Sequence, residues 1–207
     1  MKNWPEPFNL VVCGVGGQGN ILISRLIGRI LTAQGYIVSI GETFGAAQRG
    51  GSVFSSLRIS QKRLLGPLIP KGQANIILSL EPLEALRQMK FLGNSEVMVL
   101  TNTKIVQTAD VLAGRVAYPD VDQLTSAITT LSKRAWFVPA TDLALNLGSA
   151  IVTNIIMLGA LVGSKTMPIN LEQAENEVRA TIPNSQIEVN LEALNRGYQA
   201  TRDADAA

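Results

Sequence analysis

The sequence predicts an α/β protein of three layers, in which helices cover both faces of a largely parallel sheet. Short runs rich in Val, Ile and Leu alternate along the chain with longer segments of helical periodicity. The first apolar run ends in Gly14-x-Gly16-x-x-Gly19 and a helical pattern follows, which is the order of a Rossmann-like glycine turn. The chain has 207 residues and is 46% hydrophobic, enough for the core of one domain.

The first strand, turn and helix organise the rest of the chain. Residues 8–13 are continuously apolar, as in a strand covered on both faces, and residues 21–31 repeat apolar side chains at helical spacing. The glycines between them allow a sharp turn and the close approach of a ligand. The following helix directs free N–H groups and about half a positive charge at that turn. We expect an anion or a polar group of another chain there; the alternative is a turn that only packs helix on strand.

The remaining elements follow from the same patterns. Further strands are predicted at residues 36–41, 53–59, 74–80, 96–100 and 135–138, with a loop at 61–71. Further helices are predicted at 82–92, 120–133, 140–163 (one helix or two joined ones), 171–181 and 187–199. In 140–163 the spacing predicts a core stripe of Leu147, Ile151, Ile155, Leu158 and Val162. We expect a single domain over residues 1–200 and a disordered tail at 201–207.

Composition excludes several classes of function. The net charge of +2 without a long basic run, and aromatic residues at 5%, do not suggest nucleic-acid binding. One cysteine and no histidine exclude an internal disulfide, a Ser-His-Asp triad, and a zinc or iron–sulfur site built by this chain alone. Cys13 is expected to be a small buried hydrophobe.

One stretch could be mistaken for a membrane span. Residues 143–162 are apolar but carry Asn146, Ser149, Thr153 and Asn154, so we expect a buried helix and no membrane partner. The first eight residues lack the apolar run of a signal peptide, and we expect a cytoplasmic protein.

Ligands of parallel sheets bind at the carboxyl ends of the strands. We therefore expect the loops at residues 14–20, 42–52 and 101–103 to meet at one edge. In the second of them Arg49 offers a rigid fork of donors suited to phosphate or carboxylate, as a phosphate clamp or a docking loop. The alternative is a surface turn in which Arg49 pairs with Glu42. The candidate binding residues are Gly14, Gly16, Gly17, Gln18, Gly19, Asn20, Gln48, Arg49, Gly50 and Gly51.

A dinucleotide site is the competing interpretation of these loops. Glu42 stands at the end of the second predicted strand, where an acid would bind a ribose hydroxyl. Against this, no substrate domain follows. The aspartates at positions 110, 120, 122 and 142 form no recognisable catalytic pattern and are expected to be helix caps and loop residues. We assign no catalytic residue and no metal ligand.

A family resemblance covers about residues 8–198. It is carried by Gly14-Val15-Gly16-Gly17-Gln18-Gly19, Glu42-Thr43-Phe44-Gly45-Ala46-Ala47-Gln48-Arg49-Gly50-Gly51-Ser52-Val53, Pro67-Leu68-Ile69-Pro70, Leu80-Glu81-Pro82-Leu83-Glu84-Ala85, Asn102-Thr103, Asn154 with Leu158-Gly159-Ala160, and Glu188-x-Asn190. Together they resemble the gamma-type domain of 2-oxoacid:ferredoxin oxidoreductases, and within that family the small beta subunits that serve indolepyruvate. Phe44 departs from the pattern, since the family often has His there.

The resemblance implies a non-redox subunit of a complex that converts a 2-oxoacid, indolepyruvate or another arylpyruvate, to an acyl-CoA with loss of CO2. It implies that thiamine diphosphate and iron–sulfur clusters lie on larger partner subunits and that ferredoxin accepts the electrons. Coenzyme A would lie at the interface, facing Arg49 and the N–H groups of residues 16–20, with Gln18 and Gln48 as side-chain donors. The alternatives are a free-standing NAD(P)-binding module and a purely structural scaffold subunit. The isolated chain is expected to self-associate through exposed apolar helices.

Overall fold

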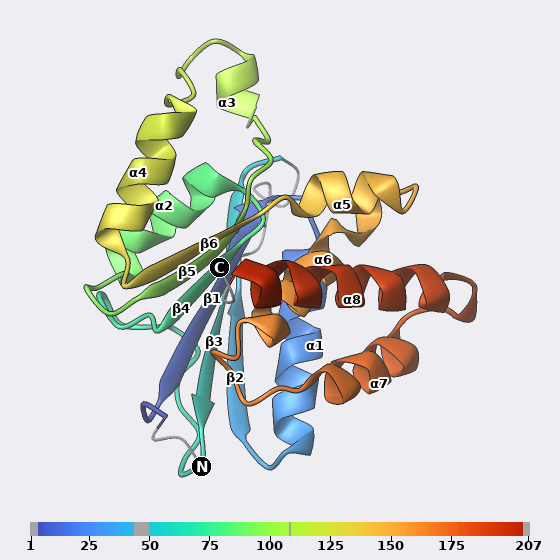
Figure 1. The fold of residues 1–207 in the computed structure, drawn as a ribbon. Coiled ribbons are helices and arrows are strands. Elements are labelled where there is room, and N and C mark those ends of the chain that lie inside the picture. Colours follow the sequence, from blue (N-terminus) through green and yellow to red (C-terminus); the bar gives the residue numbers. More distant parts are fainter. Residues whose placement is uncertain (1–3, 44–49, 108, 205–207) are drawn as a thin grey trace.

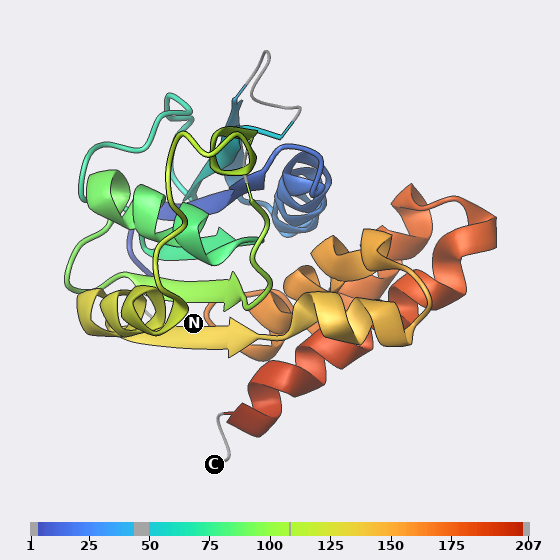
Figure 2. The ribbon, with the colours of Figure 1, turned by 90° about the horizontal axis from the view of Figure 1, so that it is seen from above.

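The computed structural model describes residues 4–43, 50–107 and 109–204, which form a six-stranded sheet between two helical layers (Figures 1 and 2). The strands are β1 (Phe8–Val15), β2 (Ile37–Glu42), β3 (Ser52–Ser60), β4 (Ile76–Ser79), β5 (Met98–Asn102) and β6 (Arg134–Val138), in the spatial order β2-β3-β1-β4-β5-β6. Strand β3 runs antiparallel to β1 and β2, whereas β1, β4, β5 and β6 are parallel. The sheet is therefore mixed, and the predicted three-layer α/β fold is confirmed.

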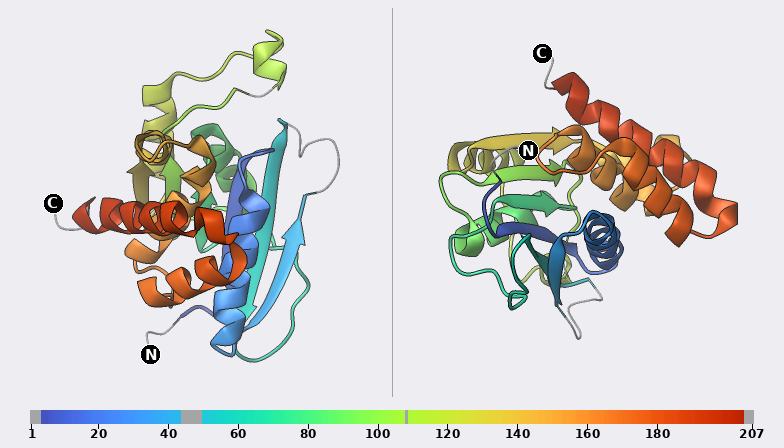
Figure 3. Two further views of the ribbon diagram at one scale, coloured as in Figure 1. Left: turned by 90° about the vertical axis from the view of Figure 1, so that its right-hand side faces the viewer. Right: turned by 90° about the horizontal axis from the view of Figure 1, so that it is seen from below.

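The helices divide between the two faces of the sheet (Figures 1 and 3). One layer contains α1 (Asn20–Ala33), α5 (Ala140–Asn146), α6 (Thr153–Gly163), α7 (Leu171–Thr181) and α8 (Ile187–Ala204), with the 3-10 turns η2 (Ala150–Val152) and η3 (Asn184–Gln186). The other layer contains α2 (Pro82–Leu92) and α4 (Val121–Leu131). Helix α3 (Ala109–Leu112) projects from the sheet in the segment between β5 and α4.

Strand β1 is the centre of the core. All of its residues are buried, as expected for a strand flanked by neighbours and covered on both faces. Leu10 and Val12 belong to the larger core under α1 and α6, whereas Val11 and Cys13 belong to the smaller core under α2 and α4. Burial raises the pKa of the Cys13 thiol, which confirms that this residue is a small buried hydrophobe rather than a reactive thiol.

The apolar stretch of residues 140–163 is two helices rather than one. Gly148, with φ of 87°, ends the first segment in a turn, and η2 precedes α6. The predicted core stripe is wrong at Ile151, which lies in η2 and is 82% exposed. Every residue of α6 is buried, so α6 has no polar face. No helix in the described part of the chain has the length and apolarity needed to span a membrane.

Helix α8 packs closely on α6 through glycines. A Cβ at Gly159 would overlap the backbone of Leu194, and a Cβ at Gly197 would overlap the backbone of Ile156. The Thr201 hydroxyl continues this contact by donating to the carbonyl oxygen of Ala160 at 2.9 Å. Residues 201–204 are thus helical, which corrects the expectation of a disordered tail from residue 201; residues 205–207 lie outside the described residues.

Candidate functional site

The two glycine loops meet at the carboxyl edge of the sheet, as the sequence predicts. The N–H of Gly16 donates to the carbonyl oxygen of Gly51 at 2.8 Å, and the N–H of Gly50 donates to that of Gly16 at 3.2 Å. The end of β5 joins them, because the Asn102 side chain donates to the Leu80 carbonyl oxygen at 3.2 Å. Of the candidate residues, Gln48 and Arg49 lie outside the described residues.

The turn between β1 and α1 depends on glycine at three positions. Gly17 and Gly19 have φ of 104° and 90°, in the left-handed region that favours glycine. Gly14 lies in β1, where a Cβ would crowd the side chains of Gln18 and Asn20. Gly19 is also the residue before the first turn of α1, and within the described chain it brings no side-chain cap.

The start of α1 leaves backbone donors open. The N–H of Gln18 bonds to the carbonyl oxygen of Val15, but among the loop and cap bonds of the described residues none uses the N–H groups of Gly17, Gly19 or Asn20. The first turn of α1 contains no acidic residue. The positive end of the helix is therefore not neutralised by its own sequence.

A crevice of about 250 Å³ lies in front of this helix end. The described residues that line it are Gly16, Gly17, Gly19, Asn20, Ile21, Thr43, Val53, Phe54 and Ser55. Asn20 is only 5% exposed; its amide nitrogen lies 3.4 Å from the Val53 carbonyl oxygen, and its Oδ1 has no hydrogen-bond partner among the described residues. A buried amide oxygen without a hydrogen-bond partner is costly, so Asn20 is a polar lining residue whose hydrogen bonds its described neighbours leave incomplete.

Gln18 stabilises the turn rather than facing the crevice. Its Oε1 accepts from the N–H of Val15 at 2.6 Å, and its Nε2 donates to the Leu80 carbonyl oxygen at 3.1 Å. The side chain thus joins the turn to the end of β4. Gln18 was expected to donate to a ligand, because a glutamine between glycines gives no sequence signal of hydrogen bonds to its own backbone neighbours.

Glu42 does not occupy the position expected of a ribose-binding acid. Its carboxylate lies 3.5 Å from the guanidinium of Arg25 on α1. Strand β3 separates β2 from β1, so Glu42 ends a strand about 10 Å from β1 at a spacing of about 4.8 Å per strand. In dinucleotide-binding sheets the second strand lies directly beside the first. The topology therefore disfavours the dinucleotide interpretation.

A second polar cluster, which the sequence did not indicate, lies at the start of α2. Glu81 and Glu84 are buried there; the Ser52 hydroxyl donates to Glu84, and the Tyr118 hydroxyl donates to Glu81. Burial raises the pKa of Glu81, and burial together with the Glu81 carboxylate raises the pKa of Tyr118. Arg87 lies 3.3 Å from the second oxygen of Glu84. The only sequence signal was Glu81-Pro82, a helix start.

Among the aspartates, Asp120 acts as predicted: its side chain caps α4 by accepting from the N–H groups of Asp122 and Gln123, both at 3.0 Å. Asp142 lies in the first turn of α5.

Residues 9–200 match the family described as pyruvate ferredoxin/flavodoxin oxidoreductase. The chain belongs to this family. Indolepyruvate oxidoreductase subunit IorB of Archaeoglobus fulgidus is 40% identical to it over 190 residues, which are 92% of this chain and 93% of the relative. The subunit of the same name from Methanothermobacter thermautotrophicus is 35% identical over 95% of this chain and 99% of its own length. The resemblance stated from the sequence is confirmed.

Solved structures of family members share the fold. The gamma subunit of a keto/oxoacid ferredoxin oxidoreductase from Geobacter sulfurreducens superimposes with a TM-score of 0.68 at 22% identity, over 97% of this chain and 99% of that one. A 2-oxoglutarate:ferredoxin oxidoreductase from Magnetococcus marinus, solved with 2-oxoglutarate, coenzyme A and succinyl-CoA, superimposes with a TM-score of 0.73 at 19% identity. The match covers 97% of this chain and 32% of that larger one.

Proposed function

We infer that this chain is the small, non-redox subunit of a complex that oxidatively decarboxylates an aryl 2-oxoacid such as indolepyruvate and forms the acyl-CoA. Full-length similarity to proteins named as indolepyruvate oxidoreductase subunits supports this function. With one cysteine and no histidine, the chain offers no ligand set for an iron–sulfur cluster. The family resemblance implies that thiamine diphosphate, the clusters and the contact with ferredoxin belong to larger partner subunits.

The observation that most directly supports a binding site is that the two glycine loops contact each other at the N-terminal end of α1. Reciprocal hydrogen bonds join Gly16 to Gly50 and Gly51, the residues that follow Arg49 in the sequence. Open backbone N–H groups favour phosphate oxygens, and an arginine from the second loop suits the same group. Coenzyme A carries such phosphates, and we assign its contact, or that of the partner subunit, to this edge.

The carboxyl edge also carries apolar side chains suited to a partner subunit. Leu112 and Val116 lie in the segment that follows β5, and Leu145 and Ile151 lie in the segment that follows β6. All four are more than half exposed. Large apolar side chains that remain exposed at one edge of a sheet are typical of a protein interface. This part of the proposal makes the crevice an inter-subunit site.

The experiment is Asn20→Asp in the complex that copurifies with the chain. The substitution is isosteric but places a negative charge at the open helix end. We expect the KM for coenzyme A to rise about tenfold because like charges repel in the partly enclosed crevice. Arg49→Ala is expected to act in the same direction by removing a positive charge. Asn184→Asp, on the exposed η3 turn, is the control with the same change of charge.

An unchanged KM and unchanged assembly in Asn20→Asp and Arg49→Ala would exclude the assigned contact. Weaker assembly, with an unchanged KM in the fraction of the complex that still forms, would assign the crevice to the partner subunit instead. The isolated chain is also titrated with NADH, and binding is measured from the fluorescence of the cofactor. Saturable binding in the micromolar range would favour a dinucleotide site over the proposed function.

A further inference from the structure

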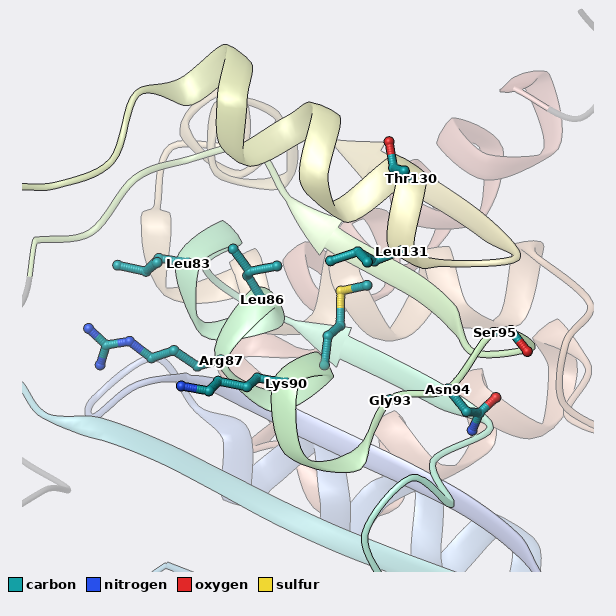
Figure 4. A pocket seen from close by; sticks show the side chains of 10 residues that line it. Leu83, Leu86, Arg87, Lys90, Gly93, Asn94, Ser95, Thr130 and Leu131 are labelled. Atoms are coloured by element: carbon teal, nitrogen blue, oxygen red, sulfur yellow. The ribbon is translucent and has the colours of Figure 1, made fainter.

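A larger groove lies away from the carboxyl edge, on the outer surface of the α2 and α4 layer (Figure 4). Its volume is about 720 Å³, within the range of about 300–1,000 Å³ typical of small-molecule sites. The described residues that line it are Leu83, Leu86, Arg87, Met89, Lys90, Gly93, Asn94, Ser95, Thr130 and Leu131.

The walls of the groove are apolar although they face solvent. Leu86 of α2 faces Leu131 of α4, and Leu131 is 57% exposed (Figure 4). Met89 of α2 also lines the groove. The outward side of a helix layer is normally polar. Met89 adds an adaptable thioether to the floor, a side chain that adjusts to differently shaped ligands.

The charges around the groove have one sign. Arg87 and Lys90 are its charged lining residues in the described chain, and both are cationic. Figure 4 shows them extending from α2 on the same side, whereas Asn94 and Ser95 lie at the other end of the groove. Two acids are close in sequence to the lining residues: Glu84 is fully buried and contacts Ser52 and Arg87, and Glu96, which follows Ser95, is paired with Lys133. An occupant that matches this surface has an apolar body and an anionic group at the Arg87 and Lys90 end.

We propose that this groove binds a small organic acid with a bulky apolar body, such as an aromatic or long-chain carboxylate. The apolar body lies between α2 and α4 over Met89, and the carboxylate lies beside Lys90. Arg87 contributes its outward N–H groups while its contact with Glu84 is kept. The inference does not depend on the proposed function, because it uses no residue of the glycine crevice.

The test uses the full-length chain and the fluorescent probe anilinonaphthalene sulfonate, with displacement by phenylbutyrate. We expect saturable binding, displacement by phenylbutyrate and much weaker displacement by phenylbutanol, which lacks the carboxylate. Lys90→Glu is expected to raise the Kd about tenfold by exchanging attraction for repulsion. Arg179→Glu, the same charge change on exposed α7, is expected to leave the Kd within about twofold.

A second pair of variants tests the apolar wall. Leu131→Gln is expected to raise the Kd about tenfold, whereas Leu112→Gln, an exposed leucine of α3, leaves it unchanged. Both side chains are largely exposed, so neither variant threatens folding. Equal effects of Leu131→Gln and Leu112→Gln, equal displacement by the alcohol, or wild-type binding by Lys90→Glu would overturn the proposal. A third result would also overturn the proposal. If Lys90 is protected from acetylation in the copurified complex and phenylbutyrate does not displace the fluorescent probe, the groove is a subunit interface.

Discussion

Helices α1 and α2 begin at the same edge of the sheet, α1 after β1 and α2 after β4. The first turn of α2 is filled by its own carboxylates, since Glu81 accepts from the N–H of Glu84 at 3.0 Å and Glu84 lies buried in the same turn. The first turn of α1 is preceded by glycines, contains no acid and opens on a crevice.

The difference between these two helix starts indicates at which of them an external anion would be stabilised. Both helix ends carry the same partial positive charge, about half an elementary charge each. At α2 that charge is matched internally. Tyr118 donates to Glu81 and Ser52 donates to one oxygen of Glu84, whose other oxygen lies 3.3 Å from Arg87 and has no hydrogen-bond partner in the described chain. The first turn of α1 contains no acid to match the charge, and this is the basis of the anion contact proposed there. Three predictions test this contrast.

The largest effect is expected from Glu84→Ala. The substitution removes a fully buried carboxylate, so the Ser52 hydroxyl and the Arg87 guanidinium lose their partner. We expect the free energy of unfolding in urea to fall by about 2–3 kcal/mol. Glu96→Ala, which breaks an exposed pair with Lys133, is the control and is expected to lower it by less than about 1 kcal/mol. Similar losses of unfolding free energy in the two variants would contradict the idea that buried carboxylates take the place of a bound anion at the start of α2.

A smaller effect, a difference of about 1–2 kcal/mol between two variants, is expected from the glycines before α1. Gly19→Ala introduces a side chain at φ of 90° and forces it against the amide of Asn154. Gly17→Ala also has a positive φ, but its Cβ would meet no atom of the described chain within 4 Å. We expect a loss of about 2–3 kcal/mol for Gly19→Ala and about 1 kcal/mol for Gly17→Ala, because only the first adds overlap to backbone strain. Thermal unfolding of both variants measures the difference; equal melting temperatures would contradict it.

The smallest effect is a pH dependence at α2. Burial raises the pKa of Glu81 above its ordinary value of 4.5, so the folded chain holds this proton more tightly than the unfolded chain. The associated stability is complete below pH 4.5 and is lost as the pH rises through the raised pKa. Glu81→Gln lacks this proton, so its stability relative to the wild type should increase with pH across that window. Urea unfolding at several pH values measures the trend, with Glu172→Gln on exposed α7 as the control.

The sequence predicted the strands and helices well because their apolar patterns were strong, and it located the crevice because glycines punctuate a strand-to-helix turn. It did not predict the reversal of β3, since apolar alternation carries no information on strand direction. The short connection at residues 43–51 contained a usable signal, because a parallel crossover needs about a dozen residues or more.

The polar cluster at the start of α2 could not be predicted from the sequence for a different reason. Tyr118 and Ser52 reach Glu81 and Glu84 from distant segments, and neither contact follows from local spacing. The sequence left one helix or two joined helices open over residues 140–163. It did not locate the break at Gly148, because the apolar pattern continues through it at nearly helical spacing and concealed the turn that exposes Ile151.

The reversal of β3 has a consequence for how this scaffold can diversify. Because β3 returns beside β1 with Ser52 opposite Val15, the connection from β2 is anchored on two strands that are themselves fixed by the sheet. Insertions or deletions between Thr43 and Gly50 therefore cost little and leave the pairing of the strands intact. The length of this connection can therefore vary while the register between β3 and its two neighbours is kept.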